Sequence, residues 1–205
     1  MCIRDSSDAT SGQTGVGTRQ TIEKAGATAT YVGLGTFRNI YVALGKGEID
    51  AGVLPIHMRF QGEREFGWNT FPLQGIEGDV PNVLATTRSF IAANRDLVTR
   101  YVEAYLDTIH AFKTQPEVFV PLLQRFLNLE DRAIAADLHR FYAPLFPAVP
   151  RLALGEGIAD VRTALAKRYP AAKDLKETDF SEPSILEAIE SSGYVKRLYS
   201  GDAKS

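Results

Sequence analysis

The sequence predicts an α/β region over residues 8 to about 92 and an almost entirely helical region over residues 93–199. In the first region, short β-branched and aromatic runs alternate with amphipathic patterns and glycine-rich turns, which is typical of strand–helix–strand units. In the second region, apolar residues recur three and four positions apart over long stretches, which is typical of packed helices. A length of 205 residues fits one large domain or two small lobes.

The α/β region begins with a Gly- and Thr-rich stretch and a helix over residues 18–25, which Gly26 ends in the C-cap position. Residues 29–32 are short, β-branched and aromatic, so they predict a strand. The next helix is capped by Thr36 and has apolar residues at i, i+3, i+4 and i+7, namely Phe37, Ile40, Tyr41 and Leu44. Residues 49–54 predict a second strand that Pro55 ends. Two strands joined in this way form a right-handed parallel crossover when they share a sheet.

Residues 61–82 predict turns with short extended pieces, because four glycines and two prolines lie among them. Residues 83–87 and 90–92 then predict two further extended runs.

The helical region begins at Asn94, which caps a helix whose apolar stripe extends to Phe112. Pro116 opens a second helix that continues to about residue 127. Apolar spacing predicts a third helix over residues 134–142 and a fourth over residues 158–165. A last short helix follows Pro183 and ends at Gly193.

Composition excludes several classes of protein. A net charge of -2 makes a nucleic-acid binder unexpected, and no apolar run is long enough for a transmembrane helix. The single cysteine, Cys2, forbids an internal disulfide and a cysteine-based zinc site. Residues 1–6 resemble adapter-derived read-in at the start of a gene fragment, so we expect them to lie outside the fold. On that interpretation the absence of a signal peptide carries no information.

Motifs of catalysis are missing. The sequence Gly33-Leu34-Gly35-Thr36-Phe37-Arg38 begins like a dinucleotide-binding loop but lacks its third glycine, and no P-loop or G-x-S-x-G turn occurs. The three histidines are far apart in sequence, so packing or surface roles are expected for them. Trp68, Phe66 and Phe71 line a pocket or close a small core, and a core is the commoner arrangement.

Two places combine a strand end with a helix start. Residues 11–14 precede the first helix and Gly35-Thr36 precede the second, so hydroxyls and backbone N–H groups converge there on a polar or anionic ligand. The alternative is that both are plain helix caps.

Several short motifs, taken in order, resemble the nitrate/sulfonate/taurine-type solute-binding proteins of ABC importers, also called thiamine-precursor-synthesis-like. Residues 43–52 read A-L-G-K-G-E-I-D-A-G, and residues 84–91, which read L-A-T-T-R-S-F-I, resemble the return strand of that family. Residues 94–113 resemble its long helix, which leads into K-T-Q-P-E at residues 113–117. Residues 192–199 are similar to its G-[FY]-x-x-x-L-Y close. The similarity covers about residues 10–200.

The resemblance implies an α/β fold of the periplasmic-binding-protein type II kind, with the ligand between two lobes. It places the second lobe at residues 8–80, hinge return strands at 81–92 and, at 93–200, C-terminal helices that pack on an incomplete first lobe. It implies no catalysis, no cofactor and no metal. It implies a small-molecule solute, the permease subunits of the importer as partners, a monomer when complete, and a periplasmic or lipid-anchored extracytoplasmic location. The implied ligand-binding residues are Gln13, Thr14, Thr36, Phe37, Pro55 and His57.

Two other functions stay open at this point. One is an enzyme like the pyrimidine-precursor synthases, which would want a cysteine-rich iron site, whereas no cysteine follows Cys2. The other is the effector domain of a regulator. We also expect the helices between Asn94 and Tyr142 to expose apolar stripes that first-lobe strands of a longer protein would cover.

Overall fold

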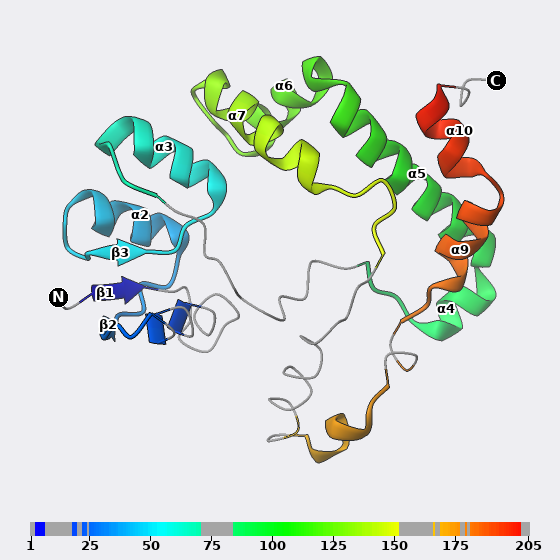
Figure 1. Cartoon of the computed structure of the whole chain (residues 1–205), viewed down its shortest axis with the longest axis horizontal. Coiled ribbons are helices and arrows are strands. Elements are labelled where there is room, and N and C mark those ends of the chain that lie inside the picture. The colour runs from blue at the N-terminus through cyan, green and yellow to red at the C-terminus, as the bar shows by residue number, and fades with distance from the viewer. Residues whose placement is uncertain are drawn as a thin grey trace. The chain divides into compact units, whose positions relative to one another are not determined.

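A computed structural model describes residues 3–6, 18–19, 22–23, 25–70, 84–151, 166, 169–176, 179 and 181–201 of the chain. The chain forms two compact units. Met1–Ile76 and Leu129–Leu138 make up the first, and Glu77–Asn128 and His139–Ser205 the second. Figure 1 labels helices and strands of the chain. The described residues are mostly helical and include a three-stranded parallel sheet in the first unit, so helices and strands are both present, as predicted.

The sheet contains β1 (Ile3–Ser6), β2 (Ala29–Tyr31) and β3 (Ala51–Gly52) in the order β2-β1-β3. Both outer strands run parallel to β1, and Asp5 is the register partner of Tyr31 on one side and Ala51 on the other. The expectation that residues 1–6 lie outside the fold was therefore wrong. β1 forms because its backbone pairs with β2 on one side and β3 on the other. Backbone pairing does not depend on side chains, so a four-residue strand carries little sequence signal.

The predicted strand–helix–strand unit is confirmed as a parallel arrangement, with β1 lying between its two strands. Helix α2 (Phe37–Gly45) connects them and buries Ile40 and Ala43 against Ile49. The helical residues 18–19 and 22–23, followed by Gly26 at φ 65°, agree with the predicted first helix.

Helix α3 (Ile56–Phe66) follows β3, so the prediction of turns was wrong for residues 61–66. Gly62 was interpreted as a turn residue, but it is buried within the helix against the ring of Trp68. Because Gly62 has no side chain, the ring of Trp68 can lie directly against the backbone of α3, and the helix continues through this glycine. Gly67, at φ 66°, ends the helix in the left-handed conformation that glycine adopts most easily. Residues 71–82 lie outside the described residues.

The extended run expected at residues 90–92 is also corrected, because these residues belong to helix α4 (Arg88–Ala93). The hydroxyl of Thr87 accepts a hydrogen bond from the N–H of Phe90 at 3.1 Å and caps the helix. A short apolar run without alternation does not distinguish a strand from a helix, and here the cap decides. The described residues 84–87 belong to no strand either, so the hinge return strands assigned to residues 81–92 include no strand from residue 84 onward.

The helices predicted from Asn94 onward are confirmed as α5 (Arg95–Thr114), α6 (Pro116–Phe126) and α7 (Arg132–Tyr142). Asn94 holds the N-cap position of α5, but its side chain donates to the carbonyl of Phe90. The fourth helix, expected at 158–165, lies outside the described residues.

The core of the second unit forms where α5 meets two C-terminal helices, α9 (Ser184–Ser191) and α10 (Tyr194–Ser200). Leu106 of α5 is fully buried there with Ile185, Ile189 and Leu198. The predicted last helix is α9, whereas α10 beyond Gly193 was not predicted. Short 3-10 turns cover Ala143–Leu145 and Pro170–Asp174. Among the described helices, none is both long and apolar enough to span a membrane.

Candidate functional site

The carboxyl edge of the parallel sheet is the candidate site. β2 ends at Tyr31 and leads through residues 32–36 into α2, while β3 ends at Gly52 and leads through residues 53–55 into α3. Because the strands are parallel, their carboxyl ends lie at one edge of the sheet, and both helices start from it. The structure therefore brings together two of the three chain segments to which the resemblance assigns ligand contacts. The third, with Gln13 and Thr14, lies outside the described residues.

Thr36 is exposed at this edge and caps α2. Its hydroxyl oxygen accepts from the N–H of Asn39 at 3.2 Å, while Nδ2 of Asn39 donates to the carbonyl of Leu34 at 2.8 Å. These two bonds fix the turn in which Gly35 adopts φ 81°. The hydroxyl acts as an acceptor here, so its O–H remains able to donate to a ligand. Sequence reasoning missed Asn39, whose side chain donates to the carbonyl of Leu34 and does not form a capping box.

Phe37 follows the cap and is half-buried against the cluster of Ile40, Ala43 and Ile49. Its ring anchors the start of α2 on the core. Its backbone N–H belongs to the first helical turn, whose amides have no partner within a helix. Phe37 therefore offers a ligand its amide more readily than its ring.

Pro55 and His57 begin α3 at the same edge. The carbonyl of Pro55 accepts from the N–H groups of Met58 and Arg59, at 2.9 and 3.1 Å, and no side chain caps this helix. His57 is half-buried in the first turn, and burial lowers the pKa of its imidazole. The ring is therefore neutral at pH 7, with one nitrogen to donate and one to accept.

Arg19 and Tyr31 form a pair that sequence reasoning did not find. The guanidinium carbon of Arg19 lies 4.6 Å from the centre of the Tyr31 ring, within the range of a cation–π contact. Tyr31 is the last residue of β2, so this contact puts a positive charge at the carboxyl edge. Nothing in the spacing of residues 19 and 31 indicates the contact, because it depends on the fold.

A cluster of aromatic rings lies near the ends of α2 and α3. The rings of Phe66 and Trp68 stack with centroids 4.9 Å apart, and Tyr41 meets Trp68 edge-on at 5.0 Å. The hydroxyl of Tyr41 donates to Glu65 at 2.6 Å, and burial together with this bond raises the pKa of the phenol. The described rings pack on one another, but Phe66 is 43% exposed and none of the three rings is fully buried, so neither alternative is decided. Phe71 lies outside the described residues.

The remaining histidines pack against other side chains, as the sequence suggested. His139 is buried with Nε2 2.6 Å from the carbonyl oxygen of Phe112, and His110 lies edge-on to the ring of Tyr199. In the part of the chain that the structure describes, no group of three or more His, Cys, Asp or Glu side chains is arranged to hold a metal ion.

Comparison with protein-family models, with curated proteins and with solved structures finds no match to this chain.

Proposed function

We propose that this chain is the solute-binding component of an ABC importer and takes a small polar or anionic solute at the carboxyl edge of its parallel sheet. One observation carries the proposal. Thr36 and Pro55 begin two helices that leave the same edge of one parallel sheet. Open α/β sheets bind ligands outside the carboxyl ends of their strands, and helix N-termini favour negative charge.

The chemistry of this edge suits a small oxyanion. The hydroxyl of Thr36, the first-turn amides of α2 and the neutral ring of His57 are donors without charge. Such donors favour a sulfonate, nitrate, taurine or carboxylate over a strongly charged phosphorylated solute, which calls for several cations. The proposed function is capture and release, with no covalent step.

The assignment to an importer rests on the ordered motifs between residues 43 and 199. On that basis the proposed location is periplasmic or lipid-anchored, and the proposed partners are the permease subunits of the importer. The proposed ligand site at the carboxyl edge of the sheet can be tested directly by mutation.

The test compares Thr36→Val with Thr87→Val. Both threonines cap a helix through a hydrogen bond to the N–H three residues on, at 3.2 Å and 3.1 Å, but Thr87 caps α4 in the other unit. Each variant is expected to lose about 1 kcal/mol of stability through its lost cap. Loss of a ligand hydrogen bond, worth about 1 kcal/mol, should weaken binding about fivefold in Thr36→Val alone.

Binding is measured by calorimetry with methanesulfonate, taurine, nitrate and acetate, and choline and a bulky apolar alcohol serve as contrasting probes. A dominant response to the cationic or apolar probes would contradict the proposal. Equal affinity in the two variants would leave Thr36 a helix cap only.

A further inference from the structure

The contact between Arg19 and Tyr31 adds a positive charge to the neutral donors at the carboxyl edge of the sheet. Arg19 lies with its guanidinium carbon 4.6 Å from the ring centre, and both side chains are only partly buried. Within the described residues, no carboxylate forms an ion pair with Arg19. The neighbour that the structure identifies for the charge of Arg19 is therefore the aromatic ring of Tyr31.

An arginine that stacks on a ring keeps its donors available. The ring faces the flat side of the guanidinium, whereas the five N–H groups point outward in its plane. Two of these N–H groups, side by side, match the spacing of two oxygens on a carboxylate or sulfonate. Stacking also restricts the side chain before a ligand arrives, which lowers the entropy cost of binding.

We propose that Arg19, held by Tyr31, is the residue that selects an anionic head group with two or more oxygens at the carboxyl edge of the sheet. This inference rests on the proposed function, because it assigns charge recognition within the same site. Thr36 and the first-turn amides supply neutral donors, and Arg19 supplies the charge that separates a sulfonate or carboxylate from an uncharged solute of the same shape.

Asp5 is the acidic residue whose backbone is in register with Tyr31 in the sheet. If Arg19 serves to hold Asp5, removal of either charge should lower the stability of the fold and leave anion affinity unchanged. The test therefore includes Asp5→Asn.

The experiment measures the affinity of the full chain for methanesulfonate and for dimethyl sulfone, an uncharged molecule of similar shape. Arg19→Gln should weaken methanesulfonate binding about tenfold, because a charge-assisted bidentate contact is lost, and should change dimethyl sulfone binding less than about twofold. Arg19→Lys should be intermediate, since an ammonium cannot donate bidentately. Tyr31→Phe keeps the ring face and should bind normally, whereas Tyr31→Leu should bind more weakly.

Arg100→Gln is the matched control, because Arg100 is an exposed arginine on α5, in the other unit of the chain. It should alter methanesulfonate affinity less than about twofold at physiological salt, where exposed charges are screened. Equal losses in Arg19→Gln and Arg100→Gln would overturn the inference, as would normal methanesulfonate affinity in Arg19→Gln. In the second case the proposed function survives if Thr36→Val still weakens binding. If the unsubstituted chain binds neither probe, the proposed function and the inference fail together.

Discussion

Gly62 lies against the indole ring of Trp68, so closely that a Cβ at Gly62 would be 2.9 Å from Cδ2 of the ring and nearer still to Cε3 and Cζ3. This contact makes a glycine in the middle of α3 favourable. It also fixes the residues that follow the helix, because Trp68 stacks in turn on Phe66.

Gly62→Ala should therefore destabilise the chain, although alanine is the better helix former by about 1 kcal/mol. The added methyl group overlaps the ring, and overpacking of this kind costs about 1–3 kcal/mol. Trp68 is the single tryptophan, so its fluorescence reports displacement of the ring directly.

Gly33→Ala is the control, since a Cβ there meets nothing within 4 Å and the backbone is not left-handed. It should leave both stability and fluorescence nearly unchanged. If Gly62→Ala stabilises the chain by urea unfolding, the close contact does not exist in solution.

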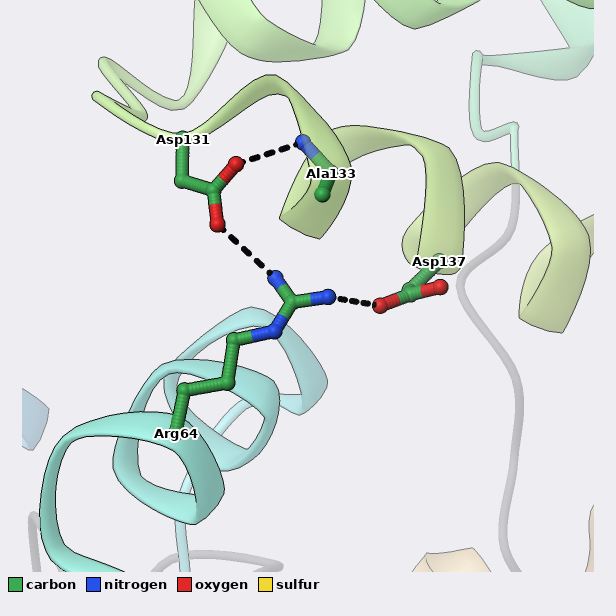
Figure 2. Close-up of polar contacts among 4 residues, drawn as sticks. All are labelled: Arg64, Asp131, Ala133 and Asp137. Atoms are coloured by element: carbon green, nitrogen blue, oxygen red, sulfur yellow. Dashed lines mark hydrogen bonds and ion pairs between the residues drawn. The ribbon is translucent and has the colours of Figure 1, made fainter.

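Arg64 joins α3 to α7 in the first unit. Its two terminal nitrogens donate to Oδ2 of Asp131 at 3.2 Å and to Oδ2 of Asp137 at 2.5 Å (Figure 2). Asp131 has a second role, because its other carboxylate oxygen accepts from the N–H of Ala133 at 2.7 Å at the start of α7. The two aspartates should therefore differ in their effect on stability.

A double-mutant cycle with Arg64→Met and Asp137→Asn should give a coupling energy of about 0.5–1 kcal/mol that declines with added salt. Asp131→Ala should cost about 1 kcal/mol more than Asp137→Asn, since it also removes a helix cap. The control is the cycle for Lys46 and Glu48, whose Nζ and Oε1 atoms are 3.9 Å apart and whose side chains are mostly exposed. It should give no measurable coupling. Equal coupling in both pairs would mean that Arg64 does not hold α7.

Tyr194 should make the stability of the fold depend on pH at alkaline pH. Its hydroxyl donates to Oδ1 of Asp107 at 2.8 Å, and burial, this bond and the nearby negative charge raise the pKa of the phenol to about 12. The unfolded chain releases this proton near pH 10, while the native state keeps it up to about pH 12. The native state binds more protons in this window, so stability should fall as pH rises from 10 to 12.

Tyr194→Phe should make the fall between pH 10 and 12 less steep in denaturant titrations. Some slope should remain, because the pKa of Tyr41 is raised in the same direction. Tyr101→Phe, at a side chain that is 59% exposed, is the control for the loss of a tyrosine hydroxyl as such. Identical profiles for all three proteins would show that the bond to Asp107 does not form.

The elements that could be predicted from the sequence are those with local signals. Thr36 and the apolar spacing after it gave α2, and Pro116 gave the start of α6. The failures depend on contacts between distant residues. β1 needs β2 and β3 beside it, and Gly62 suits its place in α3 because the ring of Trp68 leaves no room for a side chain.

The candidate site also contains residues that the sequence named and a residue that only the structure identified. Thr36 was named because it lies where a predicted strand ends and a predicted helix begins, whereas Pro55 and His57 were named only from the resemblance. Arg19 was not named, because its significance comes from the ring of Tyr31 twelve residues later, which only the folded chain brings to it. Phe37 was named as a contact, but its ring packs on the core because it shares the apolar face of α2.

Helix α6 presents an apolar stripe to solvent. Val118, Leu122 and Phe126 recur every four residues and are 45%, 40% and 86% exposed, as expected from the sequence for this part of the chain. Exposed apolar stripes promote association between copies of a chain. Phe126 contributes most to this tendency, because nearly all of its ring is in water.

Phe126→Ser should raise the fraction of monomer measured by size exclusion with light scattering. It should change the free energy of unfolding by less than about 0.5 kcal/mol, since the ring is scarcely buried in the folded state. Phe119→Ser is the matched control on the same helix, where the ring meets Phe112 edge-on with centroids 5.2 Å apart. That variant should lose about 2 kcal/mol or more, because it removes a packed aromatic side chain. If Phe126→Ser is as destabilising as Phe119→Ser, then Phe126 is packed in solution and the stripe is not a free surface.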